Sequence, residues 1–170
     1  MKSKIIIVDE NDNPIGVKER DDKDLKIIYR VAALWLTNSK GEFLLARRAY
    51  NKSHNPGQWG PAVAGTVEEG ETYESNIIKE TKEELGLDLK LSDLKIGPKI
   101  HVKTKWNHFT QFYIVNLDTD IKDIKFEPKE VAEVKWFSPV DLKRELSVHP
   151  EEFLASLQED NFYQMFYDSN

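Results

Sequence analysis

The sequence predicts an α/β fold, in which a mixed β-sheet carries helices on its faces. Two observations lead to this prediction. Short apolar segments separated by turn residues recur along the 170 residues, as expected for strands. Between them, residues 72–86 place apolar side chains at helical spacing, and Ser138-Pro139 is typical of a helix start. The length fits one domain over residues 1–170.

The N-terminal half is expected to form paired strands. Ile5–Val8 and residues 15–17 flank the turn Asn11–Pro14 and predict an N-terminal β-hairpin. The charged segment 20–26 is expected to be a surface connection. Three further strands are expected at 30–37, 42–48 and 61–65, the first two joined by a turn at 38–41.

The second half predicts strands followed by helices. After a helix that opens at Thr72 or the glutamates before it and ends near Gly86, strands are expected at 95–102, 110–117 and 133–137. Helices are then expected from Ser138 and over 150–159. An aromatic tail at 162–167 is expected to pack on the body or on a second subunit, so a homodimer is one possible assembly.

Composition excludes several classes of function. The net charge of −6 argues against a broad nucleic-acid footprint, so no nucleic-acid duplex is expected as a partner. With no cysteine, the chain has no disulfide, thiolate zinc site or cysteine nucleophile. Its N-terminus has four apolar residues before the first acid, too few for a signal peptide or a membrane span. We therefore expect a cytoplasmic protein without a membrane partner.

An acidic cluster in the predicted helix indicates a metal site. Glu80, Glu83 and Glu84 lie three and four residues apart, which places them on one face of the helix. Like charges one turn apart destabilise a helix, and the end of the helix near Gly86 favours cations instead. A bound divalent cation would remove both penalties. Carboxylate oxygens favour Mg²⁺ or Mn²⁺.

Residues 65–87 resemble the signature of the Nudix hydrolase family, G-x5-E-x7-R-E-U-x-E-E-x-G-U, in which U is aliphatic. Lys79 stands where the family has arginine, and Thr81 stands where it has an aliphatic residue. The matching residues are Gly65, Glu71, Glu80, Glu83, Glu84, Gly86 and Leu87. The resemblance implies an α/β/α sandwich that uses Mg²⁺ or Mn²⁺ to cleave a diphosphate linkage in a nucleoside-diphosphate-type or related small molecule.

The resemblance also implies roles for these residues. Glu80, Glu83 and Glu84 would be metal ligands, together with a main-chain carbonyl near Gly65. In the family, the glutamate at position 71 and the arginine at position 79 fix the loop to the helix. Lys79 keeps the charge but loses the two-pronged guanidinium, so we expect a looser brace. Thr81 is expected to be semi-buried.

The reaction also needs a general base that takes a proton from water. Glu83 or Glu84 can serve, since a carboxylate beside the metal can hold the water. An acid from another loop is the alternative, and three acids precede or begin the last predicted strand: Glu127, Glu130 and Glu133. Of these we single out Glu130 as a candidate catalytic residue.

Candidate substrate contacts come from cations and rings outside the helix. Arg47 and Arg48 end a predicted strand and point to opposite faces, so at most one of them faces the site. Arg30 is a similar phosphate-binding candidate. Trp59 either stacks on the substrate or anchors the loop from the core, the reading we favour slightly. Further possible contacts are Trp106 and Phe109; no role is assigned to any histidine.

Two alternatives to hydrolysis remain. Residues 5–90 also resemble isopentenyl-diphosphate isomerase and its Nudix relatives, through segments such as Leu44–Ala49 and Pro56–Trp59. Isomerase chemistry would need a cysteine and histidines near the Gly65 loop, where this chain has Ala64 and Thr66. A non-catalytic binding module is the other alternative, although such proteins usually lose the acids that are retained here.

Overall fold

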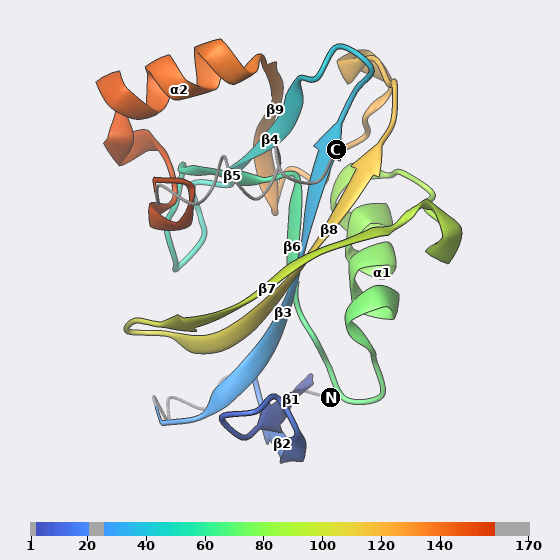
Figure 1. The fold of residues 1–170 in the computed structure, drawn as a ribbon, viewed down its shortest axis with the longest axis vertical. Coiled ribbons are helices and arrows are strands. Elements are labelled where there is room, and N and C mark those ends of the chain that lie inside the picture. The colour runs from blue at the N-terminus through green and yellow to red at the C-terminus, as the bar shows by residue number, and fades with distance from the viewer. Residues whose placement is uncertain (1–2, 21–25, 159–170) are drawn as a thin grey trace.

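The computed structural model describes residues 3–20 and 26–158. Within these ranges the chain forms one mixed nine-stranded sheet and two α-helices (Figure 1). The strands are β1 Lys4–Val8, β2 Pro14–Glu19, β3 Ile28–Thr37, β4 Phe43–Arg48, β5 Trp59–Pro61, β6 Val63–Thr66, β7 Lys95–Lys103, β8 Asn107–Asn116 and β9 Val131–Phe137. The helices are α1 Tyr73–Leu85 and α2 Pro139–Val148. The predicted N-terminal hairpin is confirmed as β1 paired with β2.

Strand β3 is the centre of the sheet. It pairs antiparallel with β1, β4 and β6, and parallel with β8. The parallel register runs from Tyr29 opposite His108 to Thr37 opposite Asn116. The mixed sheet that the sequence predicted is therefore confirmed. It places the start of β3 beside the start of β8, which matters for the cavity described below.

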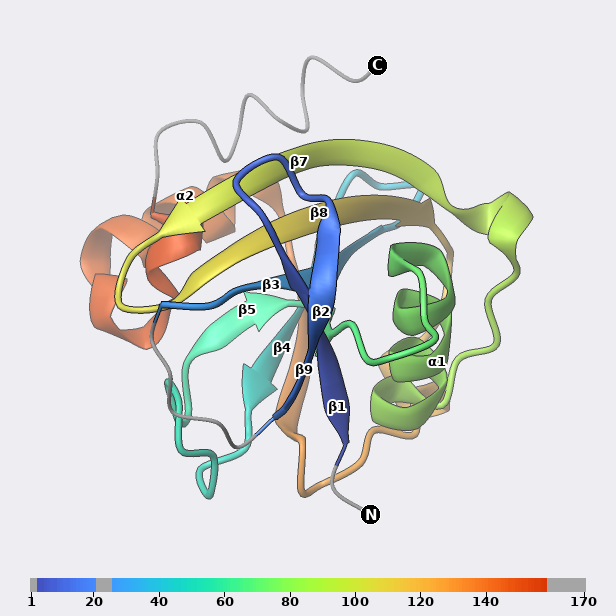
Figure 2. The same cartoon turned by 90° about the horizontal axis from the view of Figure 1, so that it is seen from below.

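The two helices cover opposite faces of the sheet (Figure 1 and Figure 2). Side chains alternate along a strand, so each central strand supplies both faces. On the α1 side, Leu34 and Leu44 belong to a core cluster with Ile77. On the α2 side, Trp35 and Leu45 belong to a second cluster with Leu142. The α/β/α sandwich follows from these two apolar layers.

Two predicted elements differ in the structure. The strand expected at 61–65 is divided at Ala62 into β5 and β6, because the first part pairs with β4 and the second with β3. The helix expected at 150–159 is wrong for its described part, which forms two 3-10 turns, Pro150–Glu152 and Ala155–Leu157. Tertiary contacts outweigh the local helix signal in this segment, because Phe153 is buried and forms a β-bridge with Trp59.

Some expectations lie outside the described residues. They include the tail at 162–167 and most of the connection at 20–26. No helix in the described ranges is long and apolar enough to cross a bilayer. On the N-terminal hairpin, Ile15 is 67% exposed and Val17 is 41% exposed. The homodimer stays a prediction.

Candidate active site

Local sequence fixes both ends of α1 and therefore the positions of its glutamates. Thr72 caps the start, because its side chain accepts a hydrogen bond from the Ser75 amide (3.1 Å) while the Ser75 hydroxyl accepts one from the Thr72 amide (2.8 Å). Gly86 ends the helix with a left-handed φ of 69°, which glycine adopts without steric cost. Glu80, Glu83 and Glu84 thus lie in the last two turns.

The three glutamates differ in burial. The Glu80 side chain is only 15% exposed, Glu84 is partly buried, and Glu83 is exposed. Burial raises the pKa of Glu84 to about 8, and the negative charges of Glu80 and Glu130 add to the rise. Burial also raises the pKa of Glu80, against the opposing charge of Lys79. The surrounding protein therefore only partly compensates the ionised forms of these two neighbouring carboxyl groups.

The donor set fits a hard divalent cation, which binds carboxylate oxygens and would compensate this charge. In the described ranges, however, no group of three His, Cys, Asp or Glu side chains converges closely enough to hold an ion without rearrangement. The ligand roles of Glu80, Glu83, Glu84 and the Gly65 carbonyl therefore stay predictions.

The backbone of β6 packs closely against α1 at Gly65. A Cβ at this position would lie 2.4 Å from Glu80 Cγ and 2.8 Å from Asn76 Oδ1. Such distances are too short for any side chain. Glycine is thus needed here for the close approach of a strand to the acidic face of the helix.

The predicted brace between the loop and the helix is present. Lys79 Nζ lies 2.6 Å from Glu71 Oε1, and Asn76 Nδ2 donates to Glu71 Oε2 at 2.8 Å. Asn76 is fully buried, and the sequence analysis missed it because the signature leaves its position free. Thr81 is more buried than expected and has no exposed surface. Its hydroxyl can be buried because it donates a hydrogen bond to the Ile77 carbonyl at 2.6 Å.

Glu130 lies close to the end of α1. The Glu127 amide donates to the Glu84 carbonyl at 2.9 Å, which fixes the turn that precedes β9 against the helix. Glu130 forms an ion pair with Lys52 and is near enough to raise the pKa of Glu84. Glu133 instead faces Arg47 at 3.9 Å. Among the three loop acids, the structure therefore brings Glu130 to the glutamate cluster.

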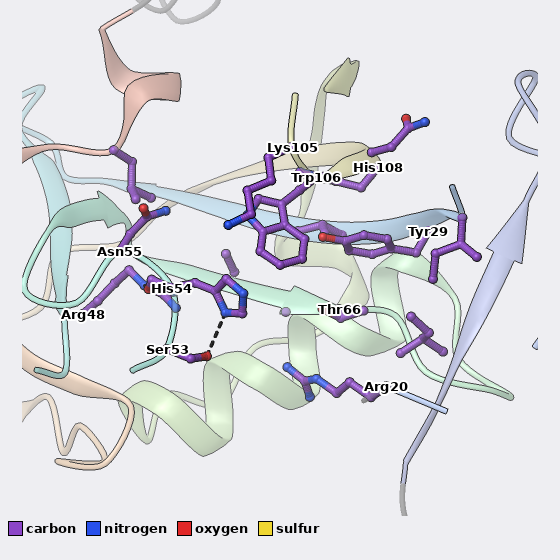
Figure 3. A pocket seen from close by; sticks show the side chains of 17 residues that line it. Arg20, Tyr29, Arg48, Ser53, His54, Asn55, Thr66, Lys105, Trp106 and His108 are labelled. Atoms are coloured by element: carbon purple, nitrogen blue, oxygen red, sulfur yellow. Dashed lines mark hydrogen bonds between the residues drawn. The ribbon is translucent and has the colours of Figure 1, made fainter. Parts of the chain in front are cut away.

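A cavity of about 890 Å³ adjoins the acidic helix face, since Gly65 belongs to its wall (Figure 3). Three cations line it, Arg20, Arg48 and Lys105, and none of the described lining residues is acidic. Ring side chains form another part of the wall: Tyr29, His54, Trp106 and His108. In a protein with a net charge of −6, this lining is complementary to an anionic ligand.

The cavity wall includes some of the predicted substrate contacts and not others. Arg48 and Trp106 line the cavity. Arg30 does not, because its Nε donates to Asp12 Oδ1 at 2.7 Å. Arg47 donates to the Gly57 carbonyl at 2.8 Å on the other side of β4. Trp59 is buried in the second core cluster, so the slightly favoured core reading is the one the structure supports.

Phe109 is also absent from the described cavity wall. It is buried and stacks on His101, with 4.0 Å between ring centroids. For Arg30, Arg47, Trp59 and Phe109, a direct substrate contact therefore stays a prediction. In this structure each of them takes part in packing or ion pairing.

Sequence reasoning missed two histidines of the cavity. The His54 ring lies 4.4 Å from the Trp106 ring, so two loops meet across the cavity. His108 stacks on Tyr29 at 5.2 Å between centroids, and burial lowers its pKa to about 4. The parallel pairing of β3 with β8 creates this second contact. No spacing in the sequence signals it, because the two residues are far apart along the chain.

Comparisons with known proteins agree with this geometry. The family model of the NUDIX domain matches residues 27–157. An isopentenyl-diphosphate Delta-isomerase of Photorhabdus laumondii is 27% identical over 159 residues, covering 86% of this chain and 84% of the relative. An uncharacterized Nudix hydrolase of Nostoc sp. is 31% identical over 139 residues, covering 80% of each chain.

Among solved structures, a protein of Deinococcus radiodurans superposes with a TM-score of 0.77 at 25% identity. The match covers 96% of this chain and 99% of that one. The family match spans most of the chain and includes the acidic helix, the Gly65 strand and most residues of the cavity wall. The chain therefore belongs to the Nudix family and is a Nudix hydrolase.

Proposed function

We propose that this protein hydrolyses a diphosphate linkage in a nucleoside-diphosphate-type or related small molecule, with Mg²⁺ or Mn²⁺ as cofactor. One observation carries the proposal. A pair of partly buried carboxylates, Glu80 and Glu84, lies next to a cavity whose described lining includes cations and no acids. The acidic side suits a divalent cation, and the basic side suits a phosphate group.

The carboxylates Glu80, Glu83 and Glu84 and the Gly65 carbonyl would hold the cation. When bound, it supplies charge neutralisation at phosphate oxygens and a more acidic water. In the hydrolysis, the oxygen of a water molecule would bond to phosphorus while the bond from phosphorus to the bridging oxygen breaks. One of three carboxylates, Glu83, Glu84 or Glu130, takes the water proton, and the leaving phosphate departs with the bridging oxygen.

Arg48 has the position expected of a phosphate-binding residue. It lines the cavity, and its Nε donates to the His54 carbonyl at 2.9 Å, which fixes the direction of the guanidinium. Burial lowers the pKa of Arg48, and the negative charges of Glu84 and Glu130 oppose this shift. A guanidinium held in this way can bind two phosphate oxygens and orient the scissile bond.

The proposal is tested by a panel of diphosphate compounds incubated with Mg²⁺ or Mn²⁺. We expect at least one compound to be hydrolysed, and turnover to be lost in Glu84→Gln and Glu83→Gln. The matched control is Glu69→Gln, since Glu69 is exposed and pairs with Lys4 at 3.8 Å. Unchanged turnover in both site variants would refute this mechanism.

Similarity to an isopentenyl-diphosphate isomerase over 86% of the chain supports a second candidate, isomerisation of isopentenyl diphosphate to its allylic isomer. The cavity residues Ala64 and Thr66 argue against it, because they provide neither the thiol nor the imidazole that the resemblance requires. Incubation with isopentenyl diphosphate separates the two candidates. Appearance of dimethylallyl diphosphate would favour isomerisation, and release of phosphate would favour hydrolysis.

A further inference from the structure

Asn76 is a fully buried polar residue between β6 and the acidic face of α1. Its Nδ2 donates to the Thr66 carbonyl at 3.1 Å and to Glu71 Oε2 at 2.8 Å, and lies 3.5 Å from Glu80 Oε1. Its Oδ1 is buried without a partner. Rotating the amide by 180° would bring this oxygen against the carboxylate of Glu71, so the acceptors fix the orientation of the side chain.

Asn76 complements the lysine that replaces the arginine of the family signature. An arginine fork binds both oxygens of a carboxylate, whereas a lysine ammonium is a single point of charge. Here Lys79 Nζ forms an ion pair with Glu71 Oε1 at 2.6 Å, and Asn76 Nδ2 donates a hydrogen bond to Glu71 Oε2 at 2.8 Å. Lys79 and Asn76 together thus make the two contacts that one guanidinium would make.

Asn76 also joins the helix to the strand that carries Gly65. The hydrogen bond to the Thr66 carbonyl holds the end of β6 against α1, next to the point where Gly65 approaches Glu80. A change in this bond would therefore move the Gly65 carbonyl relative to the Glu80 carboxylate. Both of these groups belong to the oxygen set assigned above to the cation.

We propose that Asn76 is a positioning residue that aligns Glu71, Glu80 and the end of β6 for cation binding, in partnership with Lys79. The proposal rests on the metal-dependent function proposed above. Residues that orient metal ligands through hydrogen bonds typically change metal affinity by roughly 10- to 100-fold when they are replaced.

The test measures Mn²⁺ binding to the purified protein by electron paramagnetic resonance, without substrate. Asn76→Leu keeps the branched shape of the side chain but removes the donors, and we expect it to weaken Mn²⁺ binding by roughly 10- to 100-fold. Adding Lys79→Arg to this variant restores the fork and should recover most of the affinity. Thr81→Val is the matched control, because Thr81 is buried in the same helix and its hydroxyl bonds only to the Ile77 carbonyl.

A second readout does not depend on metal. Hydrogen exchange of the Glu68 amide, which donates to Glu71 Oε2 at 2.9 Å, should accelerate in Asn76→Leu and recover with Lys79→Arg. If Asn76→Leu does not fold, Asn76→Ala is measured in the same pair of assays. Equal Mn²⁺ affinity in folded Asn76 variants and the unsubstituted protein overturns this inference alone. Failure of the unsubstituted protein to bind Mn²⁺ overturns the proposed function and the inference with it.

Discussion

Arg47 and Arg48 are neighbours in β4 but lie on opposite sides of it. Arg48 lines the cavity, whereas Arg47 donates to the Gly57 carbonyl and lies 3.2 Å from Glu152. Since hydrogen bonds to charged groups contribute about 1.5–3 kcal/mol, Arg48→Ala should raise KM for the substrate roughly tenfold or more. Arg47→Ala should lower the thermal midpoint and leave KM unchanged. Steady-state kinetics and thermal melts on both variants check this, and equal KM values would contradict it.

Gly65→Ala should impair metal binding through Glu80. The added methyl group would lie 2.4 Å from Glu80 Cγ, so the carboxylate must move away from its present position. We expect weaker Mn²⁺ binding and a fall in kcat, both measured on purified protein. Gly16→Ala is the matched control, because a Cβ at Gly16 meets no atom within 4 Å and the residue has no left-handed φ. Equal effects of the two substitutions would refute a specific role for Gly65.

Trp59→Ala should act on stability. Trp59 is 5% exposed and packs edge-on against Phe137 at 5.4 Å between ring centroids. Removing a buried aromatic ring typically costs about 3–5 kcal/mol in the free energy of unfolding, which urea denaturation measures. Trp106→Ala is the comparison, since Trp106 lines the cavity and should change KM more than stability. A large change in KM with normal stability for Trp59→Ala would reverse this assignment.

Asp12 should stabilise the fold in a pH-dependent way. Burial would raise its pKa, but hydrogen bonds from Lys99 at 2.6 Å and Arg30 at 2.7 Å hold the pKa below its usual value. Because the folded-state pKa is lowered, the stabilisation is present above the unfolded-state value and is lost as pH falls through the folded-state value.

Asp12→Asn provides the comparison, since asparagine also tolerates the positive φ of 64° at this position. The difference in the free energy of unfolding between the two proteins should be largest at neutral pH and should shrink below about pH 4. Urea denaturation at several pH values measures it. A difference that stays constant across this range would refute the role of the Asp12 charge.

The sequence predicted the elements whose signals are local. Helix α1 was predicted from Thr72 and Gly86, because a capping side chain and a left-handed glycine act within one turn of the helix end. The Ser138-Pro139 start of α2 is confirmed for the same reason. The 3-10 turns within residues 150–157 were not predicted from the sequence. They depend on the burial of Phe153 in the core beside Trp59, which lies far away in the sequence.

The residues of the site also differ in whether a local signal or a distant contact determines their position. The glutamates follow from spacing within one helix, and the partial burial of Glu80 and Glu84 follows from the sandwich. The cavity wall depends on register between distant strands, as with Tyr29 and His108. Asn76 could not be recognised from the sequence, because the signature leaves its position free. Its role follows only from the folded structure, in which its amide donates to the Thr66 carbonyl of β6 and to Glu71.

The cavity cations come from three separate parts of the chain: Arg20 follows β2, Arg48 ends β4, and Lys105 lies in the β7–β8 turn. The acidic helix contributes none of them. Under the proposed function, selectivity and bond cleavage would thus depend on different segments. Exchange of one connecting segment could therefore retarget the enzyme to another metabolite while its hydrolytic apparatus is inherited unchanged.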